Sequence, residues 1–203
     1  MWQKFIKVIK NPKIVLWRIK YGIAGIIVRQ VEKDGQIFYK YKGELYPEYL
    51  KKKKAAPNIF ATAKKYCQGQ GIDIGAGDCP FLGSIPVENE EKQNAFKLDN
   101  FKDNSLDYIF SSHCLEHLAA WQKALKLWIK KIKPGGILFL YSPHVSMPLW
   151  RPGGWWVFDN HKWSPTHEVF IRYLKENGLE IVGYNPGKDR YWSFYVVARK
   201  KYA

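Results

Sequence analysis

The sequence has no apolar run long enough to cross a membrane. Its longest stretch, Tyr21 to Val28, is far shorter than the roughly 18 residues that a transmembrane helix needs, and Lys20 and Arg29 bracket it. Lysines also interrupt the first thirteen residues, which excludes the apolar core of a secretory signal peptide there. We therefore expect a cytoplasmic protein that meets a membrane, if at all, only at its surface.

Cysteine is scarce, and its few copies are not paired in the sequence. Cys67, Cys79 and Cys114 are odd in number and scattered, and no two of them form a CxxC pair. Thiols in this arrangement are typical of reduced proteins of the cytosol. The sequence therefore indicates no disulfide framework.

Apolar residues, aromatic residues and positive charge are abundant. The hydrophobic fraction of 46%, with 9 Trp, 13 Tyr and 11 Phe, excludes a disordered chain, and 203 residues suit one domain with a short appendage. The net charge is +15, but it is uneven: residues 1–70 hold 16 Lys and Arg against 4 Asp and Glu, whereas residues 71–203 hold 17 against 14. This asymmetry predicts an anionic partner for the first segment, either a membrane surface or a polyanion.

The chain is expected to divide into a basic extension, residues 1–57, and a main domain, residues 58–203. Residues 1–20 have the spacing of amphipathic helices, whose apolar face either lies in a membrane interface or packs on the domain. Asp34-Gly35 then predicts a β-hairpin turn. Tyrosines and lysines alternate after it, which suits single-stranded nucleic acid or a solvated charged face. Because no RNA-binding signature accompanies them, the charged face is favoured.

The segment GIDIGAGDCP, residues 71–80, combines a buried strand with a glycine turn. Its isoleucines end the strand, and Gly75, Ala76 and Gly77 then form a tight turn in which no Cβ obstructs a ligand that approaches the backbone. Asp73 lies just before the turn, where its carboxylate can orient the loop or accept hydrogen bonds from a cationic or hydroxylated ligand. Pro80 stands where a dinucleotide-binding fingerprint needs a third glycine.

Further motifs follow the turn in a fixed order. They are an Asp after a strand (KLDNF), a D-x-hydrophobic strand (LDYIFSS), Glu-His-Leu (CLEHL), and Lys-Pro-Gly-Gly leading into ILFLYS. With the Asp-x-Gly-x-Gly of the turn, this series over residues 71–145 resembles the class I S-adenosylmethionine (SAM)-dependent methyltransferases, in particular small bacterial enzymes with a type-11-like domain. The resemblance implies an α/β fold, a Rossmann-like seven-stranded and mostly parallel sheet with an antiparallel last strand. It also implies SAM as the cofactor.

The resemblance assigns the cofactor contacts to particular positions. Glu88, which ends the second strand, is expected to bind the ribose hydroxyls, and Asp99 with the backbone amide of Asn100 is expected to contact the adenine. The full set of expected cofactor residues is Asp73, Gly75, Ala76, Gly77, Glu88, Asp99, Asn100 and Ser111. The chain between the turn and the second strand is too short for the full helix that the family usually has there.

The elements around these positions can be placed along the chain. We expect helices over residues 58–68 and from Glu116 to about residue 131, and short strands over residues 94–99 and 106–111. Residues 143–163 form a long loop rich in Pro, Trp and His. Its length and aromatic content predict a substrate lid.

Methyl transfer to a hydroxyl requires alignment of donor and acceptor and removal of a proton. Histidine is the side chain that titrates nearest neutral pH, and the candidate bases are His113, directly after a strand at the sheet edge, and His161 in the lid. His113 and His117 have the i, i+4 spacing of a helical metal site, but the helix is expected to begin between them and HExxH is absent. No metal site is therefore expected. The candidate substrate contacts are His144, Trp155 and Trp156.

The sequence restricts the methyl acceptor mainly through family motifs that it does not contain. SSHC stands where enzymes that methylate exocyclic or amide nitrogen carry (N/D/S)-PP-(Y/F), and no Pro-Cys nucleophile is present there. That leaves oxygen, small-molecule nitrogen or carbon acceptors. Among these we expect O-methylation of a glycan or another small hydroxylated substrate, free or lipid-linked at the cytoplasmic membrane face. The alternatives are an RNA methyltransferase that uses the basic extension as a clamp and a SAM-binding protein without catalysis.

Overall fold

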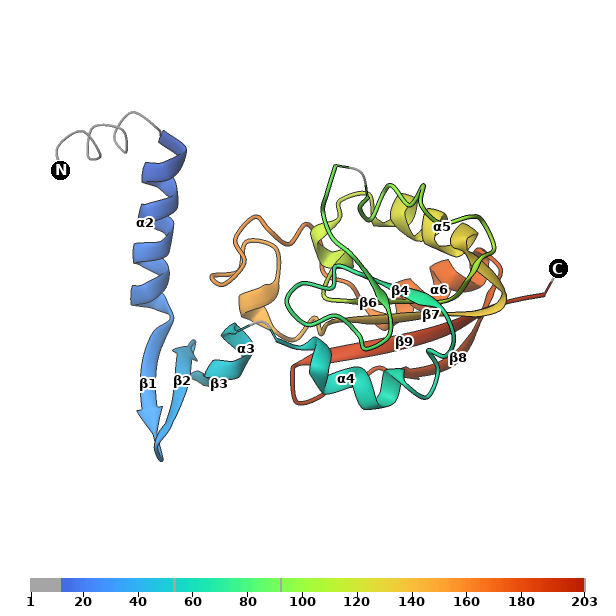
Figure 1. Ribbon diagram of the computed structural model, residues 1–203. Helices are drawn as coiled ribbons and strands as arrows, with labels where there is room; N and C mark the ends of the chain where they lie inside the picture. The colour runs from blue at the N-terminus through green and yellow to red at the C-terminus, as the bar shows by residue number, and fades with distance from the viewer. Residues whose placement is uncertain (1–11, 53, 92, 203) are drawn as a thin grey trace. The chain divides into compact units, whose positions relative to one another are not determined.

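The structure is a computed structural model that describes residues 12–52, 54–91 and 93–202. The chain forms two compact units that divide between residues 53 and 54 (Figure 1). The boundary predicted from the sequence, between residues 57 and 58, falls inside helix α4 (Ala56–Ala63), which belongs to the second unit. The first part of the expected amphipathic segment, residues 1–11, lies outside the described residues.

The first unit combines one long helix with a small antiparallel sheet. Helix α2 continues past residue 20, its predicted end, because no proline or turn signal interrupts YGIAGII. The hairpin turn falls at Asp34-Gly35 as predicted, where φ values of 51° and 70° give the left-handed conformation that a two-residue hairpin turn requires. The elements are α2 (Pro12–Ile27), β1 (Arg29–Lys33), β2 (Gln36–Tyr41), β3 (Glu44–Pro47) and α3 (Glu48–Lys51).

Tyrosines form the small core of this unit. Tyr39 and Tyr46 pair across β2 and β3, and both are buried. The Lys51 ammonium donates a hydrogen bond to the Tyr39 hydroxyl at 3.2 Å and lies 4.3 Å from the centre of its ring. These rings are therefore not available to stack on nucleic-acid bases.

The second unit is built on a mostly parallel sheet in the strand order β5-β4-β6-β7-β9-β8, in which β9 runs antiparallel to both of its neighbours. This is the expected Rossmann-like arrangement. The strands are β4 (Gly71–Ile74), β5 (Ile85–Val87), β6 (Leu106–Ser112), β7 (Ile132–Pro143), β8 (Leu179–Asn185) and β9 (Ser193–Lys200).

Among the described residues this sheet has six strands and not the expected seven. The strand predicted over residues 94–99 is wrong, because only an isolated bridge joins Asn94 and Lys97. The Asn94 side chain accepts a hydrogen bond from the Phe96 backbone amide at 2.9 Å, and this local turn competes with an extended strand.

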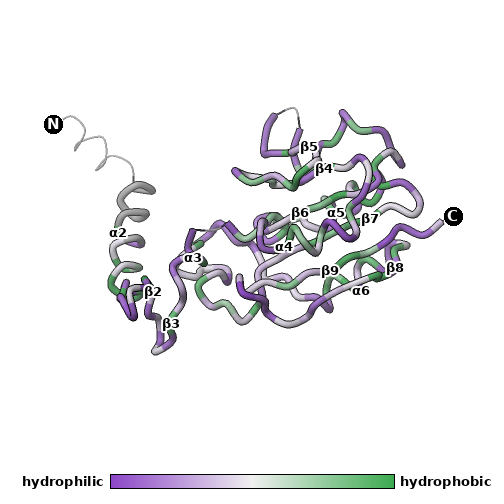
Figure 2. Tube along the Cα trace, turned by 60° about the horizontal axis from the view of Figure 1, so that its bottom comes forward, coloured by the Kyte–Doolittle hydropathy of each residue, from purple (hydrophilic) through white to green (hydrophobic). Residues whose placement is uncertain are grey.

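Helices cover both faces of the sheet, as Figure 1 shows. The residues of each central strand alternate between two apolar cores: Ile109 and Leu138 face the core beneath α5 (Trp121–Lys131) and α6 (His167–Glu176), whereas Phe110 and Phe139 face the core beneath α4. Figure 2 shows apolar residues concentrated in the central elements and polar residues in the outer loops.

Helix α5 begins at Trp121, five residues later than predicted. The predicted start at Glu116 belongs to a separate 3₁₀ turn, η1 (Leu115–His117). The carbonyl oxygens of Leu115 and Glu116, which a continuing helix would use, instead accept the Trp163 indole N–H and the Lys162 backbone amide at 2.8 Å and 2.7 Å. A return of the distant loop therefore stops the helix.

The predicted end of this helix is confirmed, since α5 stops at Lys131 and β7 follows directly. A Cβ on Gly136 would lie 2.8 Å from the Asp107 carbonyl oxygen, so only glycine allows the close approach of β7 to β6 here. None of the helices in the described part of the chain has both the length and the apolar character to cross a bilayer.

Candidate cofactor and acceptor site

The glycine turn lies at the carboxyl end of β4, where open α/β sheets bind ligands. Gly75 and Gly77 both have left-handed φ values, 77° and 54°. The Gly75 amide donates to the Val87 carbonyl at 2.8 Å, and the Gly77 amide donates to the Glu88 carboxylate at 2.6 Å. The turn is therefore tied to the end of β5, and the structure brings Glu88 to it as the resemblance implies.

The two glycines of the turn serve different purposes. A Cβ on Gly75 would lie 2.8 Å from the Cβ of Cys114 and 3.0 Å from its sulfur, so this glycine is required by packing inside the protein. A Cβ on Gly77 would meet no described atom within 4 Å. Open space lies on the Gly77 side of the turn, and a ligand can approach the backbone there.

Asp73 is buried beside the turn with one oxygen in use. Its Oδ2 accepts the Phe81 amide at 2.8 Å, which orients the loop after the turn. Its Oδ1 has no hydrogen-bond partner among the described residues. Burial, and secondarily the charge of Glu88, raises the pKa of this carboxyl to about 7. A carboxylate oxygen of this kind is suited to a cationic ligand.

The remaining predicted cofactor residues lie in different surroundings. Asp99 and Asn100 are exposed, and the Asn100 side chain donates to Gln93 at 2.7 Å. Ser111 is buried, and its hydroxyl donates to the Ile74 carbonyl at 2.9 Å, which joins the ends of β6 and β4. Ser111 therefore stabilises the ends of these two strands. Direct contact of Ser111, Asp99 or Asn100 with a cofactor stays a prediction.

His113, the first candidate base, is enclosed by protein groups. Its Nε2 lies 2.8 Å from the Ser193 hydroxyl, which itself donates to the Tyr191 carbonyl, so Nε2 carries the hydrogen. Its Nδ1 lies 3.5 Å from Glu116 Oε1. Burial lowers the pKa of His113 to about 3, with further contributions from His161 and His117. This surrounding gives a weak base whose two nitrogens both face the protein.

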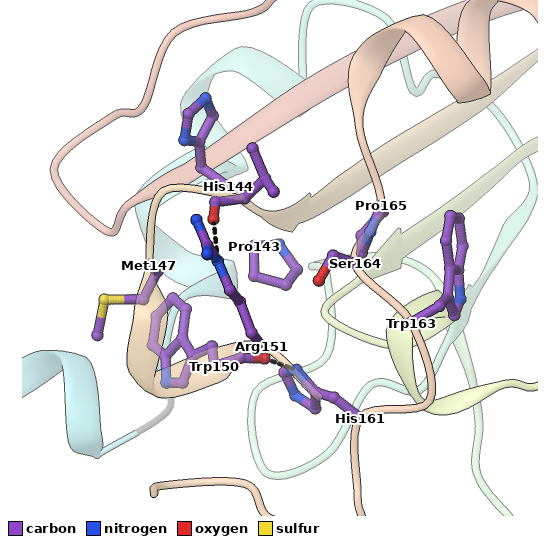
Figure 3. A pocket seen from close by; sticks show the side chains of 10 residues that line it. Pro143, His144, Met147, Trp150, Arg151, His161, Trp163, Ser164 and Pro165 are labelled. Carbon is purple, nitrogen blue, oxygen red and sulfur yellow. Dashed lines mark hydrogen bonds between the residues drawn. The ribbon is translucent and has the colours of Figure 1, made fainter. Parts of the chain in front are cut away.

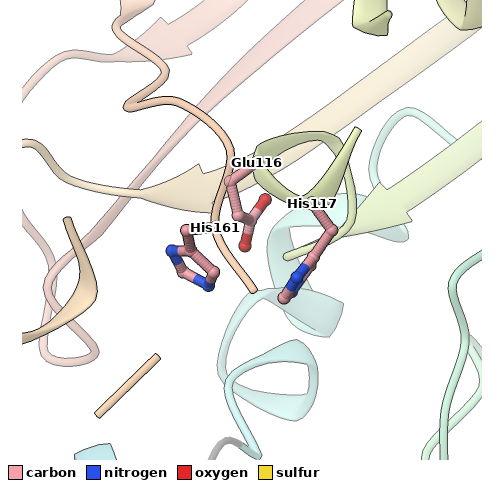
Figure 4. A group of neighbouring side chains, drawn as sticks. All are labelled: Glu116, His117 and His161. Carbon is pink, nitrogen blue, oxygen red and sulfur yellow. The ribbon is translucent and has the colours of Figure 1, made fainter. Parts of the chain in front are cut away.

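A second group of side chains, Glu116, His117 and His161, is drawn in Figure 4, and Glu116 Oε1 lies 3.5 Å from His113 Nδ1. Glu116 and His117 come from η1, and His161 comes from the loop that follows β7. One ligand atom of each lies within 4.8 Å of the others. The sequence does not indicate this group, because Glu116 and His161 are far apart along the chain.

The loop over residues 143–165 lines a small pocket whose cavity volume is only about 10 Å³ (Figure 3). His161, the second candidate base, lines it, and so does His144, whose Nδ1 is held by Ser146 at 2.7 Å. Trp155 and Trp156 are half-buried and do not line it. The aromatic walls are instead formed by Trp150 and Trp163, and Arg151 adds a positive charge.

Sequence reasoning did not select Glu116, Trp150 or Arg151. Glu116 has a local signal, the Glu-His-Leu motif, but its complete burial is visible only in the structure. Trp150 and Arg151 belong to the predicted lid, yet nothing in the lid sequence separates Trp150 from its neighbours Trp155 and Trp156.

These features define a class of protein. A Rossmann-like sheet carries, at its carboxyl edge, an open glycine turn, an acidic residue after β5 and a buried carboxylate with an orphaned oxygen. Glu88 offers acceptors for ribose hydroxyls, and Asp73 suits a positive charge. The site therefore fits a nucleoside-bearing cofactor that is cationic, as SAM is.

Comparison with known proteins finds a methyltransferase domain in part of the chain. Residues 56–140 match the family model described as "Methyltransferase domain". A segment of 75 residues is 33% identical to phosphoethanolamine N-methyltransferase 2 of Caenorhabditis elegans, and it covers 32% of this chain and 16% of that protein. Residues 56–140 therefore match a methyltransferase domain, and the cofactor implied for such a domain is SAM.

Solved structures share the fold at low sequence identity. A SAM-dependent methyltransferase from Archaeoglobus fulgidus superposes with a TM-score of 0.54 at 20% identity, covering 75% of this chain and 94% of that one. The [4+2]-cyclase SpnF superposes with a TM-score of 0.52 at 14% identity, covering 74% and 82%. Because proteins of different chemistry share this fold, the reaction must be argued from the site.

We expect Gly77→Ala to weaken SAM binding at least tenfold, or about 1.4 kcal/mol, because the new methyl group would fill the open side of the turn. Isothermal titration calorimetry measures the effect. Gly178→Ala is the matched control, since Gly178 also has a left-handed φ (83°) and open space around it, so both variants carry similar backbone strain. Equal affinities in the two variants would remove the turn from the cofactor site.

We also expect SAM to bind more tightly as the pH rises through about 7 and to reach a plateau above it. In the folded protein the pKa of Asp73 is raised to about 7, so the carboxylate that attracts the sulfonium cation forms only in this range. Calorimetry at a series of pH values measures this change in SAM affinity. In the Asp73→Asn variant the SAM affinity should not change with pH over this range.

The stability of the protein without cofactor should change in the opposite direction. The unfolded chain loses the Asp73 proton near pH 3.8, whereas the folded chain keeps it until about 7, so the free energy of unfolding should fall between these values. Asp73→Asn should remove this part of the pH dependence. A wild-type profile identical to that of the variant would contradict the raised pKa.

Proposed function

We propose that the protein transfers a methyl group from SAM to a hydroxyl oxygen of a glycan or another small hydroxylated substrate. The observation that carries this proposal is the pocket of the 143–165 loop, which a histidine, His161, shares with the cluster at the end of β6. Cys114, two residues before Glu116, packs against the glycine turn. The pocket is therefore connected to the cofactor edge through the protein's own contacts.

The cofactor supplies a methyl group on a sulfonium, which leaves by in-line displacement. The residues of the chain align the partners: Glu88, Asp73 and the backbone at Gly77 would hold the cofactor, and the loop would hold the acceptor. Of the two candidate bases, His161 is the one that lines the pocket, whereas both nitrogens of His113 face protein groups. We assign the acceptor hydroxyl to the His161 side of the pocket.

The pocket lining supports a hydroxylated and partly anionic acceptor. The guanidinium of the exposed Arg151 suits a phosphate group, and Trp150 and Trp163 supply apolar walls beside it. Such a pair of features matches a phosphate-linked glycan. A phosphorylated amino alcohol is the second candidate, because the Caenorhabditis elegans relative is a phosphoethanolamine N-methyltransferase.

We expect methyl transfer from labelled SAM to a sugar or lipid-linked glycan when the full chain is screened against these, phosphoethanolamine and RNA. His161→Ala should lower turnover by about 10²–10⁴-fold without a matching loss of SAM affinity. His167→Ala is the control, since His167 pairs with Glu168 at 3.2 Å outside the pocket. If labelled methyl groups appeared only in RNA, the protein would be an RNA methyltransferase that uses its basic extension to hold the RNA. If the protein bound SAM but gave no labelled product, it would be a SAM-binding protein without catalysis.

We further propose that the first unit brings the enzyme to an anionic membrane surface. Helix α2 exposes four isoleucines at i, i+4, i+7 and i+8, which form one helical face: Ile19, Ile23, Ile26 and Ile27. Basic residues dominate this part of the chain, and each basic residue near an anionic surface contributes about 1 kcal/mol. A basic helix with an apolar face is suited to lie in the interface.

In a sedimentation assay, the full chain should bind vesicles of anionic lipid at low salt and dissociate as the salt concentration rises. Ile26→Glu should abolish sedimentation by placing a negative charge on the apolar face, because Ile26 is 66% exposed. Ile37→Glu is the control, since Ile37 is also exposed but belongs to β2. If both variants sediment like the wild type, α2 does not bind the membrane.

A further inference from the structure

One cluster of side chains next to the pocket consists of Glu116, His117 and His161. The proposed methyl transfer gives a role only to His161. One ligand atom of each side chain lies within 4.8 Å of the others (Figure 4). Two imidazoles and one carboxylate form the ligand set of open zinc sites, and imidazole also suits other divalent ions of the first transition row. The cluster therefore has the composition of a metal site.

The two histidines are oriented as metal ligands usually are. Nδ1 of His161 lies 2.5 Å from the Trp150 carbonyl oxygen, and Nδ1 of His117 lies 3.1 Å from the Asn160 carbonyl oxygen. A carbonyl can only accept, so each Nδ1 carries a hydrogen and each neutral ring has its lone pair on Nε2. Metal-binding histidines commonly donate their other ring N–H to such a carbonyl, which fixes the tautomer and the ring orientation.

Glu116 supplies the second, independent observation. Its side chain is 0% exposed, and neither carboxylate oxygen receives a hydrogen bond from another residue in the described part of the chain. His113 Nδ1 lies 3.5 Å from Oε1, too far for a hydrogen bond. A buried carboxyl group is costly without a partner, and a cation between Glu116 and the two histidines would provide one.

The backbone holds the ligands together before any ion binds. The Lys162 amide donates to the Glu116 carbonyl at 2.7 Å, and the Trp163 indole donates to the Leu115 carbonyl at 2.8 Å. These bonds join the loop that carries His161 to the 3₁₀ turn that carries the other two ligands. His117 is exposed, which leaves a path for an ion from solvent.

We propose that Glu116, His117 and His161 bind one divalent transition-metal ion, with Zn²⁺ as the preferred probe. In a tetrahedral site with bonds of about 2.0–2.1 Å, ligand atoms lie roughly 3.3 Å apart, so small side-chain rotations close the present separations. This site replaces the expectation from the sequence, which considered only His113 with His117.

Three protein ligands leave a coordination position open. His161 also lines the acceptor pocket, so that position faces the substrate side of the cluster. With Nε2 of His161 bound to the ion, the ion would take over the role of the histidine base, because an acceptor hydroxyl placed there would lose its proton more readily. This consequence rests on the proposed function, whereas metal binding itself does not and can be measured without SAM or acceptor.

The test uses the full chain without a histidine tag, treated with a chelator and then titrated with Zn²⁺ in a calorimeter. We expect saturation at one ion per chain, and a loss of affinity of about 100-fold or more in Glu116→Gln, His117→Ala and His161→Ala, since even outer-shell changes cost 10–100-fold. His167→Ala, which removes a histidine outside the cluster, should bind like the wild type. Titration with Co²⁺ should give visible absorption bands that the same three variants lose.

A thermal unfolding series separates binding from folding. Glu116→Gln replaces a buried carboxyl group without a hydrogen-bond partner by a neutral amide of the same shape, so without metal it should unfold at the same temperature as the wild type or higher, while the rise that Zn²⁺ causes in the wild type disappears. The proposal would be overturned if the wild-type protein showed no saturable Zn²⁺ binding. It would also be overturned if Glu116→Gln, His117→Ala and His161→Ala all bound Zn²⁺ with the wild-type affinity. Failure of the methyl-transfer screen alone would leave the metal result unchanged.

Discussion

The contact between Cys114 and Gly75 is the constraint on which the site depends. A Cβ at position 75 would collide with the Cys114 side chain, and a φ of 77° is unfavourable for any other residue. The contact holds the end of β6 directly beside the glycine turn. The chain therefore begins η1 at the cofactor edge, and Glu116 and His117 cannot lie elsewhere. One packing contact thus fixes the distance between the cofactor turn and the acceptor side.

The order of motifs along the chain was sufficient to predict the class of the sheet, mostly parallel with an antiparallel strand near its end, because each motif acts locally. Asp-x-Gly-x-Gly ends a strand wherever it stands, and Lys-Pro-Gly-Gly stops a helix. The missing strand over residues 94–99 and the late start of α5 arose from interactions that a sequence pattern does not show. Asn94 bonds to its own backbone in place of a strand, and the returning loop takes the carbonyl oxygens that α5 would need to begin at Glu116.

The acceptor side could not be predicted for the same reason. Glu116 and His161 are brought together only by the return of the long loop, and the hydrogen bonds that hold the loop involve the Lys162 amide and the Trp163 indole. Hydropathy and spacing give no information about such bonds. The sequence did single out His113, which follows a strand as a catalytic residue often does, but the surroundings of its two nitrogens are visible only in the structure.

Asp73 and Glu116 are buried carboxyl groups with orphaned oxygens in a chain whose net charge is +15. Burying a carboxylate costs several kcal/mol, and a cation 4 Å away recovers about 4 kcal/mol at an effective dielectric constant of 20. Each group therefore gains most from a cation of its own. Burial raises the pKa of the nearby Cys114 thiol to about 12, so this thiol remains neutral and supplies no charge to either group. On these grounds, the cationic cofactor expected at Asp73 and the metal ion proposed at Glu116 would be separate ligands of two different sites.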